Sequence, residues 1–272
     1  MSWPCGCARF TVCFVTIVPL PSRIVSLRPL ALPAEHGGWG FLFEPMLLGL
    51  LVAPSWSGTL IGTAALFGFL ARHPLKLALQ DAMRGRSYPR TAYCRAIAAA
   101  YLAGAALSLT AAVMMSGVRV LIPLGLVTPL ALTQVLYDAH RRERELLPEL
   151  SGAAAMASIA AAVAMAGGMR IVPAFGLAGI IVARTLPSIL YVRAMLGRMP
   201  AWPAIALHAI AIACVALYAG PYAVAAMGVL LLRAMWGLSH EAPRAKTIGW
   251  REIVFGTMTV VLAAVGYWLG MP

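Results

Sequence analysis

The sequence contains few charged residues. Asp, Glu, Lys and Arg make up 11% of its 272 residues, against about a quarter in soluble domains. Hydrophobic residues make up 61%, and the mean hydropathy is +0.85. This composition excludes a soluble globular protein and predicts an all-α integral membrane protein.

Acidic residues are the scarcest of the charged ones. The sequence has 9 Asp and Glu against 21 Lys and Arg, which gives a net charge of +12. The basic residues fall in short clusters between apolar runs, as in the inside loops of membrane proteins, and not in one patch. Nucleic acid is therefore excluded as a partner, and the lipid bilayer is expected instead.

Cysteine is too sparse for a disulfide framework or a metal centre. The 5 cysteines show no metal-ligand spacing beyond one Cys-Gly-Cys in the first ten residues. We predict no metal ligands, and the sequence leaves the identity of any cofactor unknown. Residues 1–30 have some features of a signal peptide but lack its cleavage site. We expect a poorly defined tail there and one transmembrane helical domain over residues 31–272.

Nine apolar runs are candidates for membrane-spanning helices. The fifth of them is rich in Ala and Gly, so we expect other helices to surround it. The arginine-bearing loops follow the second, fourth, sixth and eighth runs, and the positive-inside rule then places the N-terminus inside and the C-terminus outside. The runs are 38–53, 57–72, 96–115, 119–137, 150–168, 171–192, 202–218, 220–237 and 252–270.

Four ionisable side chains fall inside these runs and away from their end residues, where each costs about 3 kcal/mol unless it faces a cavity or a partner. Glu44 and Arg184 lie at similar depth, so we predict that they form an ion pair, which serves either helix packing or a functional site. His208 is interpreted as a core histidine. Arg233 is interpreted as a side chain that extends to the inner membrane surface.

The inner end of the second run carries a polar stripe. Its members recur at steps of three or four and so share one helix face. Guanidinium groups match phosphate oxygens, so the stripe fits a diphosphate or an anionic lipid head group. It also fits an ordinary positive-inside loop. The stripe consists of His73, Lys76, Gln80 and Arg84, with Asp81 beside them.

The loop DAHRRERELLPE between the fourth and fifth runs is predicted to be an exposed helix. On it, Asp138 with Arg142 and Arg141 with Glu145 have the i, i+4 spacing of ion pairs. Asp138 and Glu149, at the two membrane ends of the loop, are best placed to turn inward.

Several segments resemble the YwiC-like family of bacterial membrane proteins. They are EHGGWGFLFEPMLLGLL, RHPLKLALQD with YPRT, RTLPSILYVR and KTIGWREIVFG. The resemblance runs from about residue 28 to the C-terminus. It implies a multi-pass protein of the bacterial cytoplasmic membrane.

More remotely, the architecture resembles the UbiA superfamily of intramembrane prenyltransferases. That resemblance implies a UbiA-like bundle with an active site at its cytoplasmic end. Gln80 and Asp81 stand where the superfamily's first aspartate-rich motif begins, and Arg90 with Thr91 resembles its downstream Arg-Thr.

The sequence departs from the superfamily at its metal ligands. Arg84 stands where the first motif has its next aspartate, and Arg184 and Arg193 occupy the second motif region in place of acids. One aspartate and one amide are too few oxygen ligands for Mg²⁺. Magnesium-dependent prenyl transfer is therefore not expected.

Together these features predict a cytoplasm-facing polar cavity that binds or transforms an isoprenoid diphosphate or a phospholipid head group. Two other functions fit the sequence: a small-solute or ion transporter, and a membrane assembly factor without chemistry. Glu44 and Asp81 would orient the ligand or accept protons, and His36 would act as an acid or base near neutral pH. The predicted binding residues are Glu35, His73, Lys76, Gln80, Arg84, Arg90, Arg184 and Arg193.

Overall fold

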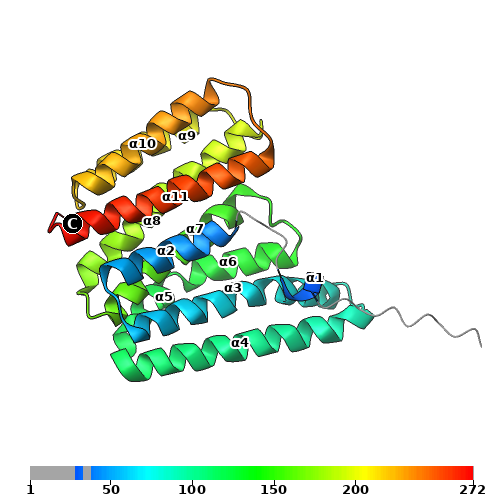
Figure 1. Ribbon diagram of the computed structural model, residues 1–272. Helices are drawn as coiled ribbons and strands as arrows, with labels where there is room; N and C mark the ends of the chain where they lie inside the picture. The colour runs from blue at the N-terminus through cyan, green and yellow to red at the C-terminus, as the bar shows by residue number, and fades with distance from the viewer. Residues whose placement is uncertain (1–27, 33–37, 272) are drawn as a thin grey trace, which may run out of the picture.

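The computed structural model describes residues 28–32 and 38–271, and all regular secondary structure within them is helical (Figure 1). The all-α fold class is confirmed for these residues. The elements are α1 (Arg28–Ala31), α2 (Gly38–Val52), α3 (Trp56–Met83), α4 (Pro89–Ser116), η1 (Val118–Leu121), α5 (Ile122–Leu126), α6 (Thr128–Ala139), α7 (Leu146–Ala166), α8 (Ile171–Met195), α9 (Trp202–Ala216), α10 (Pro221–Leu238) and α11 (Ala245–Trp268).

Five of these helices are long and apolar enough to cross a membrane: α4, α7, α8, α10 and α11. The bent segment from η1 to α6 is a sixth if it counts as one span, and α2 and α9 are shorter apolar helices. α3 carries Arg72, His73 and Lys76 in its second half, which lowers its hydropathy. The protein is a multi-pass membrane protein, while the count of nine spans stays a prediction.

The fourth predicted run, 119–137, is not one straight helix. It comprises η1, α5 and α6, with a bend of 50° between Val118–Leu126 and α6. Pro129 stands in the first turn of α6. Its missing N–H and its ring prevent α5 from continuing as an α-helix into α6.

α7 is surrounded by other helices, as its small residues predicted. It packs against α2, α3, α6 and α8, and Ala157, Ala160 and Ala161 are fully buried. Where α2 crosses it, a Cβ on Gly49 would lie 2.8 Å from the Cβ of Val163. Small residues thus let α2 and α7 approach closely.

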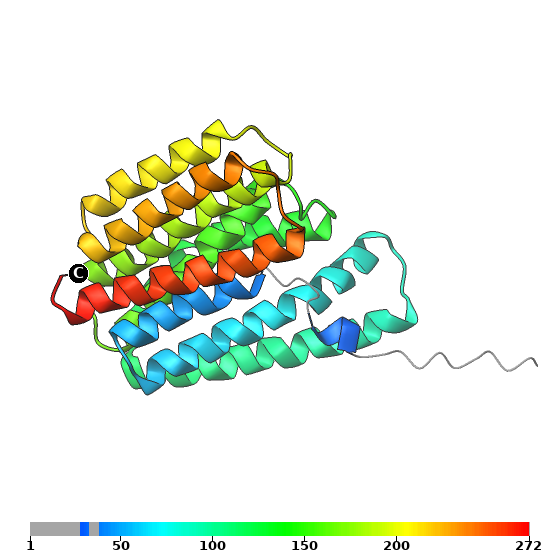
Figure 2. The ribbon, with the colours of Figure 1, turned by 45° about the horizontal axis from the view of Figure 1, so that its top comes forward.

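α11 returns beside α2, although the two helices stand at opposite ends of the described chain (Figures 1 and 2). α3 and α4 form a long hairpin on one flank, and α9 and α10 pack together on the other (Figure 2). α8 contacts α2, α7, α9, α10 and α11. The first half of α11 therefore lies close to both α2 and α8.

Candidate functional site

A cavity of 1470 Å³ lies among α2, α3, α4, α6, α7, α8 and α11. Its lining residues form three sets by chemistry, which we call the mouth, the apolar arm and the polar arm. The mouth is charged and contains Arg72, Lys76, Asp138, Glu143, Arg144, Glu149, Arg193, Arg198 and Lys246. The apolar arm includes Ile61, Gly68, Leu102, Leu109, Ala131, Val135, Met156 and Ile159. The polar arm contains Glu44, Arg184, Ser188 and Glu252.

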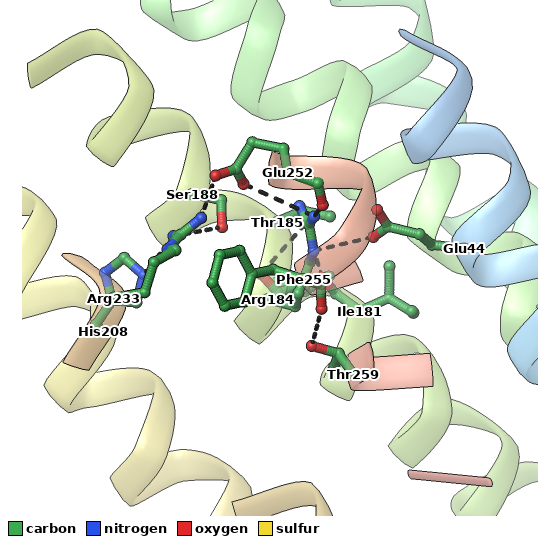
Figure 3. Close-up of polar contacts among 11 residues, drawn as sticks. Glu44, Ile181, Arg184, Thr185, Ser188, His208, Arg233, Glu252, Phe255 and Thr259 are labelled. Atoms are coloured by element: carbon green, nitrogen blue, oxygen red, sulfur yellow. Dashed lines mark hydrogen bonds and ion pairs between the residues drawn. The ribbon is translucent and has the colours of Figure 1, made fainter. Parts of the chain in front are cut away.

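Glu44 and Arg184 form the predicted ion pair in the polar arm (Figure 3). Nε of Arg184 lies 3.0 Å from Oε2 of Glu44, and the two side chains are 3% and 8% exposed, respectively. Nη2 of Arg184 donates a hydrogen bond to the backbone oxygen of Glu252 at 2.5 Å and lies 3.7 Å from its Oε2. Arg184 on α8 therefore joins α2 to α11.

Glu252 also holds a second buried arginine. Its carboxylate accepts a hydrogen bond from Arg233 of α10. Nη2 of Arg233 lies 3.3 Å from Oγ of Ser188 and 3.4 Å from Nε2 of His208. The interpretation of Arg233 as a side chain that reaches the membrane surface is wrong: the residue is 8% exposed, because Glu252 offers it a partner inside the bundle.

His208 is buried, as expected for a core histidine. Its Nδ1 lies 2.7 Å from the backbone oxygen of Ala204, one turn earlier in α9. Its other ring nitrogen faces Arg233 (Figure 3). The histidine thus ends the buried chain of polar contacts that begins at Glu44.

Sequence reasoning missed Glu252, because it is the first residue of the predicted run 252–270 and was not counted among the charges inside the runs. α11 begins at Ala245, so this acid lies inside the helix. The sequence feature that could have pointed to Glu252 is Gly256, which lies one helical turn later on the same face of α11. A Cβ on Gly256 would lie 1.9 Å from Oε1 of Glu44 and 2.7 Å from Nη2 of Arg184. The glycine leaves room for the ion pair.

At the mouth, carboxylates already hold two of the predicted ligand-binding cations. Nζ of Lys76 lies 3.0 Å from Oε1 of Glu143, and Nη1 of Arg193 lies 2.8 Å from Oε2 of Glu149. Partial burial raises the pKa of Glu143, but its own backbone N–H and Lys76 outweigh that effect and hold the pKa below its usual value. Lys76 and Arg193 are thus fixed in place by acids at the mouth.

The stretch between α6 and α7 is not the exposed helix that was predicted. Asp138 accepts hydrogen bonds from Arg72 at 2.7 and 3.1 Å, and so faces α3 and not Arg142. Arg142 bonds Glu145, three residues later. Arg141 has a φ of 63°, a left-handed conformation incompatible with a continuing α-helix. The predicted i, i+4 pairing was wrong, but Asp138 does turn inward.

Three other cations at the mouth make no ion pair within the described part of the chain. They come from three different segments: the stretch before α7, the loop after α8 and the first turn of α11. All three are exposed to solvent as well as lining the cavity. They are Arg144, Arg198 and Lys246, and sequence reasoning did not single them out.

Asp81 lies off the cavity lining. Its carboxylate accepts hydrogen bonds from Oγ1 of Thr91 at 2.7 Å and Nη2 of Arg90 at 3.2 Å. Burial raises the pKa of Asp81, but these two hydrogen bonds outweigh it and hold the pKa below its usual value. The cluster joins the end of α3 to the start of α4.

The remaining members of the polar stripe do not share one environment. Nε2 of Gln80 donates to the backbone oxygen of Asp138 at 2.7 Å. Nε2 of His73 lies 3.1 Å from the backbone oxygen of Pro29, and Arg84 is exposed after the end of α3. Of the predicted site residues, the lining holds Glu44, Lys76, Arg184 and Arg193, whereas Glu35 and His36 lie outside the described residues.

The apolar helices define the class of this protein as a multi-pass helical membrane protein. The family model described as YwiC-like protein matches residues 32–164, and over this range the chain is similar to that family. No curated protein and no solved structure matches the chain.

Proposed function

We propose that this YwiC-like protein binds an amphiphilic lipid with a phosphate-bearing head, an isoprenoid diphosphate or a phospholipid. The observation that supports this function is that one cavity joins a charged mouth to an apolar arm. The mouth would bind the phosphate and the arm would hold the hydrocarbon chain. Transformation of the bound lipid, as in a UbiA-like bundle, would take place at the same site.

The charge of the lining favours an anionic head. Seven basic and five acidic side chains line the cavity. The excess positive charge lies at the mouth, with Arg144, Arg198 and Lys246. Lys76 and Arg193 already have carboxylate partners, so a phosphate gains most from the three cations that have none among the described residues.

The apolar arm is open to the surroundings between α4 and α6. Leu102 of α4 is 47% exposed and also lines the cavity, and Ala131 of α6 likewise lines it while being exposed. A side chain with both properties marks an opening. Because this opening lies between apolar helices, a hydrocarbon chain can enter it from the bilayer without passing through water.

The proposed orientation fits this arrangement. With nine crossings and the N-terminus inside, the mouth faces the cytoplasm of a bacterial cell. In support, its charges lie at the end of α8, before α7 and at the start of α11, in the arginine-bearing connections. A cytosolic partner or water-soluble phosphate compound would then reach the lipid head directly.

Native mass spectrometry of the purified protein tests the proposal, and a co-purifying phosphate-bearing lipid is expected. Combined replacement of Arg144, Arg198 and Lys246 by Ala should lower the bound lipid about tenfold or more, since hydrogen bonds to charged groups contribute about 1.5–3 kcal/mol each. Arg244→Ala removes a neighbouring exposed charge that does not line the cavity, and should retain the lipid. Equal lipid content in the triple variant and the wild type would contradict the proposal.

A further inference from the structure

An amide side chain stands among the apolar residues that line the cavity. Gln134 of α6 lines it together with Ala131 and Val135, inside the predicted run 119–137. Its amide makes no hydrogen bond with another described residue and keeps surface that a small polar group can reach. Gln134 therefore has free hydrogen-bonding capacity towards a ligand in the cavity.

α7 leaves a place for this amide. α6 packs against α7 (Figure 1), and a Cβ on Gly152 of α7 would lie 2.4 Å from Nε2 of Gln134 and 2.6 Å from its Oε1. Gly152 also lines the cavity. Amides in membrane spans often hydrogen-bond a neighbouring helix, but Gln134 makes no such bond to any element that the structure describes. Helix pairing through a hydrogen bond therefore does not account for the amide.

Two helices place the amide one turn inside the charged mouth. On α6, Asp138 of the mouth lies four residues after Gln134, near the end of that helix. On α7, Glu149 of the mouth lies three residues before Gly152, near the start of that helix. At about 1.5 Å per residue, both spacings correspond to about 5–6 Å along a helix. The amide thus lies between the charged mouth and the apolar residues deeper in the cavity.

We propose that Gln134 donates a hydrogen bond to an ester carbonyl of a diacyl phospholipid, an inference that rests on the proposed lipid-binding function. In such a lipid the ester carbonyls lie a few bonds beyond the phosphate and just before the hydrocarbon chains, which matches the depth of the amide. The amide N–H donates and the carbonyl oxygen accepts. An isoprenoid diphosphate is hydrocarbon beyond its phosphates, so it would leave the amide without a partner, which is unfavourable. Gln134 thus selects a diacyl phospholipid over an isoprenoid diphosphate.

Two phosphatidylglycerols with the same head group and the same chain length test this contact. One has ester-linked chains and the other has ether-linked chains, so only the first offers carbonyl oxygens. Titration of the purified protein with each lipid, followed by native mass spectrometry, should give a Kd about fivefold lower for the ester-linked lipid, the effect of one neutral hydrogen bond.

Gln134→Leu removes the amide but keeps a side chain of similar size, and it should reduce the preference for the ester-linked lipid to less than about twofold. Thr133→Val is the matched control. It removes a polar group at the next position of α6, where Thr133 lies off the cavity lining and bonds the backbone oxygen of Pro129, and it should keep the preference. Gly152→Ala gives a second measurement, because its methyl group displaces the amide and should reduce the preference in the same way.

The outcomes separate the two proposals. Equal affinity of the wild type for both phosphatidylglycerols overturns the ester contact but leaves the lipid-binding function in place. A preference that persists in Gln134→Leu overturns the assignment to Gln134. Tighter binding of an isoprenoid diphosphate than of the ester-linked lipid overturns the selection of a diacyl phospholipid. Binding of none of these lipids overturns the lipid-binding function and the ester contact together.

Discussion

Glu44 on α2 and Arg184 on α8 meet inside the helical bundle, with Oε2 and Nε 3.0 Å apart. Both side chains are almost fully buried, so each depends on the other for the compensation of its charge. Arg184 keeps one further link, to the backbone of Glu252. The pair therefore makes the packing of α2 against α8 sensitive to either residue.

Removal of one partner should destabilise the protein more than removal of both. Glu44→Ala or Arg184→Ala leaves a buried charge without its partner, and we expect a loss of about 3–5 kcal/mol in the free energy of unfolding. The double variant Glu44→Met with Arg184→Met should lose much less than the two single losses added together. Thermal unfolding of the purified protein in detergent measures all three, and strictly additive losses would contradict the coupling.

A methyl group on Gly256 should disturb the same pair from a third helix. Its Cβ would lie 1.9 Å from Oε1 of Glu44, so the carboxylate must move, at a cost of about 1–3 kcal/mol for overpacking. Gly228→Ala is the control, since its Cβ meets nothing within 4 Å and alanine favours the helix. We expect a lower Tm for Gly256→Ala alone. Equal Tm values for the two variants would show that the Glu44–Arg184 ion pair does not depend on the missing side chain at position 256.

Filling the apolar arm should displace lipid without affecting the mouth. Gly68 lines this arm and has open space where its Cβ would be, so Gly68→Leu projects a side chain into the cavity. We expect several-fold less co-purified lipid by native mass spectrometry, with the Tm little changed. Gly228→Leu, on α10 and off the cavity lining, is the control. Unchanged lipid content in Gly68→Leu would place the hydrocarbon chain elsewhere.

Asp81 should contribute to stability above acidic pH. Its pKa in the folded protein lies below its usual value, so the stabilisation is fully present above the unfolded pKa of about 4 and is lost as the pH falls through the folded pKa. Asp81→Asn should therefore unfold at a lower Tm at pH 7 and show a smaller further loss than the wild type on acidification below about pH 4.

Glu145→Gln is the control for this pH dependence. Its carboxylate bonds Arg142 in an exposed pair, with side chains 43% and 60% exposed, respectively, which contributes at most about 1 kcal/mol. Melting curves at several pH values compare the two variants with the wild type. Parallel pH profiles for Asp81→Asn and the wild type would show that Thr91 and Arg90 do not stabilise the ionised form.

Hydropathy located most of the helices, but it could not place the acid that organises the site. Glu252 follows a segment with Lys246 and Arg251, so local hydropathy placed it only at the start of the predicted run 252–270. In the structure, α11 begins before it, and the acid is stabilised by Arg184 and Arg233 from two other helices. Local sequence pattern also misplaced Asp81. Its spacing suggested a ligand-binding stripe, whereas its carboxylate accepts hydrogen bonds from Thr91 and Arg90.

By itself, the sequence determined the membrane class, the all-helical fold and the pairing of Glu44 with Arg184. The membrane class and the helical fold follow from hydropathy, which is a property of consecutive residues. The ion pair follows because a charge buried in the membrane requires an opposite charge at the same depth. Only the tertiary structure decided that Glu252 completes the network, that acids hold Lys76 and Arg193, and that charged and apolar side chains line one cavity. Those relationships depend on which helix faces meet across the bundle, and packing between distant segments sets them.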